Sequence, residues 1–149
     1  KRFTSSGYID DMAAGNLCVS VGYGGDLNIA KTRAQEAKNG VEIEVLAPKS
    51  GVGIWVDSLM IPRDAQNTAN AHKYINHTLD PEVAAQNGNF VTYAPASRPA
   101  RALMDGKYTG DASIFPTKEL MDKSFIVSPK STYASRLSVR LWQSLNTGK

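Results

Sequence analysis

The chain has 149 residues, of which 42% are hydrophobic and 21% are charged, and its formal net charge is +3 at pH 7. This composition is typical of one globular domain with a hydrophobic core, and it excludes an intrinsically disordered chain. No stretch has the length of a transmembrane span and no signal peptide is recognisable, so we expect either that export is not needed or that an N-terminal part is missing.

The charges are spread unevenly along the chain. Residues 1–97 hold eight basic and ten acidic residues, whereas residues 98–149 hold nine basic and four acidic ones. The basic residues of the second part are dispersed and have few aromatic neighbours. We therefore expect a solvated face there and no nucleic-acid-binding surface.

The first third of the chain predicts a helix, a strand and a second helix. Ser5 and Ser6 can cap a short helix over residues 8–14. The apolar run over residues 17–23 is typical of a strand buried on both faces. After a glycine pair, residues 26–38 show the apolar face of a second helix.

Strands and helices continue to alternate along the rest of the chain, which indicates an α/β fold. The expected elements are a strand over 41–46, a strand over 53–61, a helix from 68 or 70 to 79, a helix from 81 to about 87 with Asp80 as its cap, a short extended stretch over 90–93, a short helix near 117–123 and an amphipathic helix over 131–145. Three strands are few for a complete open α/β sheet.

The sequence does not indicate a catalytic, metal or cofactor site. Cys18 is the single cysteine, so an internal disulfide is excluded, and we interpret it as a small buried residue of the first strand. His72 and His77 are five residues apart, whereas metal-binding pairs on one helix face favour a spacing of four, so we expect surface histidines. We therefore predict neither an enzyme nor a protein with a bound cofactor.

Asp26 lies where the first strand gives way to a helix, directly after Tyr23, Gly24 and Gly25. Its carboxylate can cap the helix, or it can bind a ligand at the carboxyl end of the strand, and both interpretations stay open. The glycine pair is a poor anion cradle because Asp26 already places a negative charge there. A carboxylate beside an aromatic ring suits an organic cation.

Asp57 interrupts the apolar strand over residues 53–61 and, by the alternation of a strand, shares a face with Trp55. An unpaired buried carboxylate costs several kcal/mol, so Asp57 needs a partner. A salt bridge or a strand end that reaches solvent would satisfy it. We favour a functional role, because Trp55 and Asp57 repeat the pairing of Tyr23 and Asp26 and together predict a site for a small amine.

Several segments, taken in order, resemble one known family: residues 7–13, 18–26, 36–41, 61–67, 79–84 and 91–95, followed by the terminal helix. They are similar to the periplasmic polyamine-binding proteins of bacterial ABC importers, and most of all to the putrescine-binding branch. The resemblance covers nearly the whole chain. It implies a two-lobed, type II periplasmic-binding-protein fold, of which this chain is the C-terminal portion.

By the pattern of that family, residues 1–45 and 100–149 belong to the second lobe and residues 48–97 to the first. The upstream segment would supply most strands of the first lobe and a disulfide partner for Cys18. The resemblance also implies a periplasmic location and an ABC permease as partner. If the fragment folds alone, we expect it to self-associate through exposed apolar surface.

The resemblance carries five ligand-binding roles onto this sequence, at Tyr23, Asp26, Trp55, Asp57 and Tyr93. Tyr23 stands where the family usually has a tryptophan, and Tyr93 is assigned by the resemblance alone. The predicted ligand is putrescine or another polyamine. Two alternatives stay open: another small solute on the same scaffold, or a stand-alone interaction domain in which Asp26 only caps a helix. A ligand with its own carboxylate would need an arginine, and none accompanies these motifs.

Overall fold

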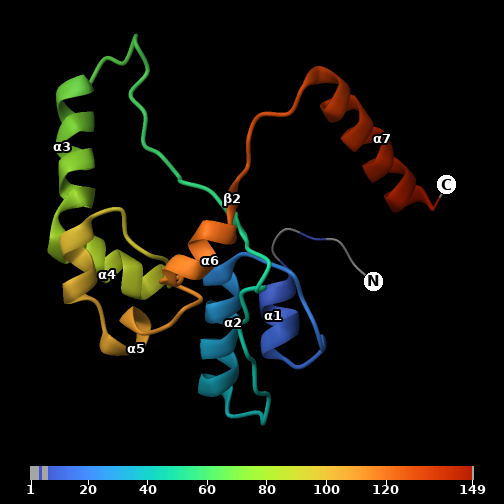
Figure 1. Ribbon diagram of the computed structural model, residues 1–149. Coiled ribbons are helices and arrows are strands. Elements are labelled where there is room, and N and C mark those ends of the chain that lie inside the picture. Colours follow the sequence, from blue (N-terminus) through green and yellow to red (C-terminus); the bar gives the residue numbers. More distant parts are fainter. Residues whose placement is uncertain (1–3, 5–6, 149) are drawn as a thin grey trace.

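The computed structural model describes residue 4 and residues 7–148, which form mainly helices and one very small sheet (Figure 1). In chain order the elements are α1 (Tyr8–Ala13), α2 (Gly24–Ala37), β1 (Gly53–Ile54), α3 (Thr68–Leu79), α4 (Pro81–Val91), the 3-10 helix η1 (Arg98–Leu103), α5 (Gly106–Thr109), α6 (Lys118–Lys123), β2 (Phe125–Ile126) and α7 (Thr132–Thr147).

Local sequence explains where several helices begin, and these predictions are confirmed. The Asp80 carboxylate accepts hydrogen bonds from the backbone N–H groups of Glu82 (3.0 Å) and Val83 (3.3 Å), which caps α4. The hydroxyls of Thr117 and Ser131 cap α6 and α7 in the same way. The cap predicted for α1 at Ser5 and Ser6 lies outside the described residues.

The predicted strands are mostly wrong. Residues 17–23 and 41–46 have no strand pairing, and of residues 53–61 only Gly53–Ile54 forms a strand, which pairs in parallel with Phe125–Ile126. Val19 and Val21, expected to be buried, are 83% and 97% exposed. A strand needs a neighbour for its backbone hydrogen bonds, and the described part of the chain places none beside these two segments.

Two smaller predictions fail for related reasons. Cys18 is a free, exposed cysteine, because the segment around it lies on the surface. Residues 90–93 are not extended, since α4 continues to Val91 and ends at Thr92, which has left-handed backbone angles (φ 55°). The packing of α4 through Ala84, Ala85 and Gly88 carries the helix beyond the end that its sequence predicts.

A hydrophobic core cluster lies between α4 and η1. Ala84 and Ala85 of α4 pack with Ala100 and Met104, and the partly buried rings of Tyr108 and Phe115 flank them. The cluster joins residues from the two ranges that the resemblance assigns to different lobes. The division of the chain into lobes remains a prediction.

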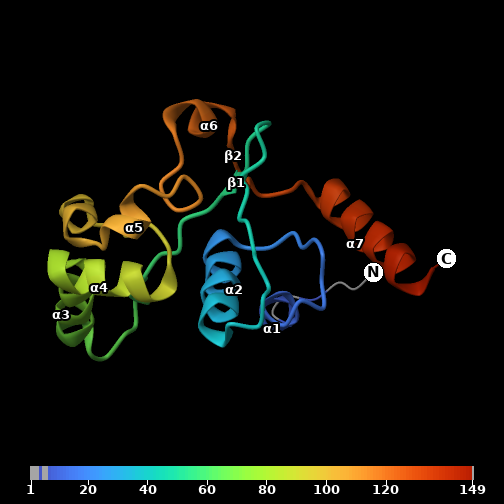
Figure 2. The ribbon, with the colours of Figure 1, turned by 90° about the horizontal axis from the view of Figure 1, so that it is seen from below.

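Helix α1 lies beside α2 in both views of the molecule (Figures 1 and 2). An ion pair between Asp10 and Arg33 joins the two helices, and the Asn39 side chain donates a hydrogen bond to the Ala13 carbonyl oxygen (3.0 Å). These two contacts hold α1 against α2 and the turn that follows it.

Helix α7 stands clear of the other elements, on the side of the molecule opposite α3 (Figures 1 and 2). The helix is confirmed, but its apolar stripe is exposed: Tyr133, Leu137, Leu141 and Leu145. Among the described helices, none is both long and apolar enough to span a membrane.

Candidate functional site

Four of the five residues predicted to bind ligand lie near one another at the N-terminal end of α2. Tyr23 is the N-cap residue of α2 and Asp26 lies in its first turn, Trp55 directly follows β1, and Tyr93 follows α4. The ring centroids of Tyr23 and Trp55 are 5.2 Å apart, and those of Trp55 and Tyr93 are 6.4 Å apart, both with edge-to-face geometry. Three aromatic side chains therefore form a continuous row beside the start of α2.

Asp26 lies close to this row but is not the helix cap. Tyr23, with extended backbone angles, occupies the N-cap position, so Asp26 is the third residue of the helix. Its half-buried carboxylate lies in the first turn, where the helix dipole favours a negative charge. The N-cap interpretation is wrong because the helix begins two residues earlier than the sequence predicts.

Tyr93 is held against the first turn of α2. Burial raises the pKa of its phenol, and the negative charge of Asp26 raises that pKa further. A Cβ atom on Gly25 would lie 2.0 Å from Cε2 of Tyr93, so only glycine allows the ring to approach this closely. The buried Thr92 hydroxyl also donates a hydrogen bond to the Gly25 carbonyl oxygen (3.0 Å).

Tyr8 is the residue of this site that sequence reasoning missed. Its hydroxyl donates a hydrogen bond to Oδ2 of Asp26 (2.6 Å) and accepts one from the Tyr23 backbone N–H (3.2 Å). Burial and the hydrogen bond to Asp26 raise the pKa of Tyr8 to about 12. Tyr8 lies 18 positions before Asp26, and no local sequence pattern links the two residues. The one feature of the sequence that relates to this contact is Gly22, whose missing side chain makes room for the Tyr8 ring.

Asp57 is the predicted residue that the structure does not join to the cluster. It is exposed, and no hydrogen bond or ion pair of its carboxylate occurs within residues 7–148. The salt bridge considered from the sequence is therefore not formed in this part of the chain. The ligand-binding role of Asp57 remains a prediction.

The cluster has the chemistry of a site for an organic cation. Asp26 supplies a fixed negative charge, and Tyr23 and Trp55, about half exposed at 51% and 46%, present ring surface to solvent. Rings of this kind attract ammonium groups and also pack against methylene groups. No group of three or more His, Cys, Asp or Glu side chains that could hold a metal ion occurs among the described residues.

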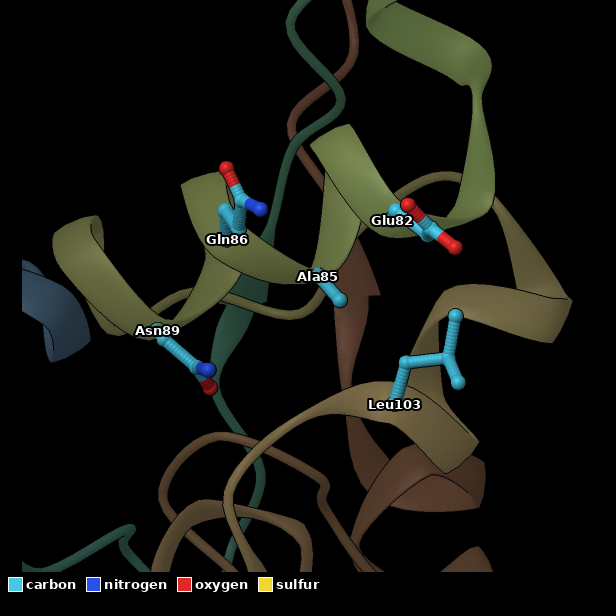
Figure 3. Close-up of a pocket in the computed structure, with 5 residues that line it drawn as sticks. All are labelled: Glu82, Ala85, Gln86, Asn89 and Leu103. Carbon is cyan, nitrogen blue, oxygen red and sulfur yellow. The ribbon is translucent and has the colours of Figure 1, made fainter.

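A separate hollow of about 200 Å³ lies between α4 and η1 (Figure 3). Ala85 and Leu103 stand on either side of it, and Glu82 and Asn89 lie at its ends. None of the five predicted ligand-binding residues lines it. The hollow is therefore not the candidate site formed by the aromatic row.

Comparison with known sequences decides the family. The family described as bacterial extracellular solute-binding protein matches residues 1–119. The chain belongs to this family. Its fold class is therefore that of the solute-binding proteins, and the helix-rich structure with a small sheet does not conflict with it.

Individual relatives are binding proteins for polyamines. The chain is 37% identical over 147 residues to the putrescine-binding periplasmic protein SpuD of Pseudomonas aeruginosa and 35% identical over 149 residues to the putrescine-binding periplasmic protein PotF of Escherichia coli. It is also 29% identical over 148 residues to a putrescine/agmatine-binding protein of Pseudomonas aeruginosa. These matches cover 99–100% of this chain, which spans only about 40% of the length of each relative. The resemblance to polyamine-binding proteins is confirmed.

Proposed function

We propose that the complete protein carrying this chain binds a small diamine, putrescine above all, in the periplasm and delivers it to an ABC permease without catalysing a reaction. The observation that carries the proposal is the row of Tyr23, Trp55 and Tyr93 beside the carboxylate of Asp26. The names of the relatives, which are putrescine-binding and periplasmic, support the same ligand and location.

In the proposed complex, one ammonium group pairs with Asp26 while Tyr23 and Trp55 lie along the methylene chain. The second ammonium group pairs with Asp57, which lies two residues beyond Trp55 and has no competing partner within residues 7–148. If the lobes divide as the resemblance implies, the two carboxylates belong to different lobes. A diamine that binds both would then stabilise the closed arrangement, which a permease can recognise.

Calorimetric titration of putrescine, and then of spermidine, into the complete protein tests the proposal. We expect saturable binding at micromolar or tighter affinity. Asp57→Ala should weaken putrescine binding at least about tenfold because a desolvated charge pair is lost. Asp64→Ala is the matched control, since it removes an equally exposed carboxylate that has no place in the site.

Unchanged affinity in Asp57→Ala would remove that residue from the site. An absence of heat with either polyamine would direct the search to other small cationic solutes on the same scaffold. Agmatine is the first of these, because one relative is a putrescine/agmatine-binding protein.

For the isolated 149-residue chain we propose a second behaviour, self-association. Large apolar side chains lie exposed over separate parts of the surface, including Val21 (97%), Met60 (86%) and Leu141 (61%). Exposed apolar surface of this kind promotes association. Size-exclusion chromatography should give a concentration-dependent mass above 16.1 kDa, and a monomer at all concentrations would exclude this behaviour.

A further inference from the structure

The hydroxyl of Tyr8 connects two residues of the candidate site. It accepts a hydrogen bond from the Tyr23 backbone N–H (3.2 Å) and donates one to Oδ2 of Asp26 (2.6 Å). The second bond has a charged acceptor and the short length of a charge-assisted hydrogen bond. One side chain from α1 thus binds both the N-cap residue of α2 and the acidic residue three positions later.

This arrangement resembles a capping box in which a third residue has been inserted. In an ordinary capping box, the acidic side chain at the third helical position accepts a hydrogen bond directly from the backbone N–H of the N-cap residue. Here Tyr8 stands between these two groups. The bridge occupies Oδ2 of Asp26, and Oδ1 accepts no hydrogen bond among the described residues, so it is left to accept one from an ammonium group.

Tyr8 can orient Asp26 because Tyr8 is itself held in place. Its side chain is only 5% exposed, and α1 is tied to α2 by the Asp10–Arg33 ion pair. A Cβ atom on Gly22 would lie 2.5 Å from Cε2 of Tyr8, so the glycine provides the space that the ring fills. A rigid donor restricts the rotamers of its acceptor and lowers the entropy that the acceptor loses when a ligand binds.

We propose that Tyr8 is a positioning residue for amine binding, which holds the Asp26 carboxylate in the orientation that receives an ammonium group. The proposal rests on the proposed function. Tyr8 does not itself contact the ligand in this scheme, and it acts through Asp26. Because its pKa is about 12, the hydroxyl remains a donor throughout the pH range in which a diamine is charged.

The test is a double-mutant cycle in the complete protein, read by calorimetric titration with putrescine. The variants are Tyr8→Phe, Asp26→Asn and the two combined. Tyr8→Phe keeps the buried ring and removes only the hydroxyl. We expect it to raise the Kd about 3- to 10-fold, because the Asp26 carboxylate must then be ordered when the ligand binds. In the Asp26→Asn background the same substitution should change the Kd less than about twofold.

Tyr74→Phe is the matched control, since it removes the hydroxyl of a tyrosine that is 60% exposed on α3 and should leave the Kd unchanged. Unfolding of each variant in urea, without ligand, gives the coupling of Tyr8 to Asp26 in stability. The stability measurement shows whether the hydrogen bond is lost, and the Kd shows whether its loss affects binding.

The outcomes distinguish the two proposals. If Asp26→Asn weakens binding and Tyr8→Phe binds like the wild type, the amine site stands and the role of Tyr8 is refuted. An equal loss from Tyr8→Phe in both backgrounds would mean that Tyr8 acts on the fold rather than through Asp26, which also refutes it. A wild-type protein that binds no putrescine would refute the proposed function and, with it, the role of Tyr8.

Discussion

The ring of Tyr93 fills the space where Gly25 would carry a side chain, and substitution of Gly25 tests this contact directly. In Gly25→Ala the new Cβ atom would lie 2.0 Å from Cε2 and 2.4 Å from Cδ2 of Tyr93. Carbon atoms in contact are normally about 3.5–4.0 Å apart, so the ring would have to move by roughly 1.5 Å. Such a movement would disturb the contact between Tyr93 and Trp55.

The expected magnitude follows from two opposing effects. Overpacking of a well-packed site costs about 1–3 kcal/mol, whereas alanine in place of glycine within a helix gains about 0.5–1 kcal/mol. Gly24→Ala measures the second effect alone, because Gly24 neighbours Gly25 in α2 and a Cβ atom there would lie 3.5 Å from its nearest neighbour, the Ser113 carbonyl oxygen. We expect Gly24→Ala to leave stability unchanged or raised, and Gly25→Ala to lower it by about 1–2 kcal/mol.

Urea unfolding of both variants in the complete protein measures the difference, and putrescine titration measures its effect on the site. A further comparison places Gly25→Ala in a Tyr93→Ala background, where the obstructing ring is absent. The destabilisation should then disappear. If Gly24→Ala and Gly25→Ala changed stability equally, or if the loss persisted without the Tyr93 ring, the close approach of Tyr93 to α2 would be refuted.

Two further predictions concern stability. Asp80→Ala should lower the free energy of unfolding by about 0.5–2 kcal/mol because α4 loses its cap, while Asp64→Ala should have no measurable effect; equal urea midpoints for the two variants would contradict this. The pKa of Tyr8 is about 12 in the folded protein and about 10 when unfolded, so the unfolded chain loses this proton at lower pH than the folded protein does. The free energy of unfolding of the wild type should therefore fall by up to about 3 kcal/mol between pH 10 and pH 12. Tyr8→Phe lacks this contribution, and parallel curves of unfolding free energy against pH for the variant and the wild type would show that the pKa of Tyr8 is not raised.

The helices could be predicted because their signals are local. Asp80 followed by proline marks the start of α4, and Ser131 marks the start of α7, since each side chain caps a backbone group two or three residues away. The end of α4 was missed because its packing against η1 depends on Ala100 and Met104, which lie beyond the helix in the sequence.

The strands could not be predicted with the same success, because a strand depends on a neighbour that the local sequence does not specify. Residues 17–23 have the apolar and β-branched composition of a buried strand, yet Val21 is almost fully exposed. Gly53–Ile54 forms a strand only because Phe125–Ile126, about 70 residues later, lies beside it. Their composition indicates a tendency to form strands, but it does not show whether a neighbouring strand is present.

The candidate site could likewise be predicted only where its signals are local. Tyr23 with Asp26, and Trp55 with Asp57, could be selected because an aromatic residue and an acid occur close together in each segment. That Tyr23 and Trp55 would pack edge to face could not be derived from either segment alone. Tyr8 is also followed by acids, Asp10 and Asp11, but the acid that it contacts is Asp26, and that pairing depends on the packing of α1 against α2.

The aromatic row joins two parts of the chain that the family resemblance assigns to different lobes. Tyr23 and Asp26 lie within residues 1–45, whereas Trp55 and Tyr93 lie within residues 48–97, and the hydrogen bond from Thr92 to Gly25 crosses between them. If that division holds, the row lies where the lobes meet, and every contact within it depends on how closed they are. Tyr8 and Asp26 both belong to one lobe, so their hydrogen bond would persist when the lobes open, and the carboxylate would be oriented before the ligand arrives.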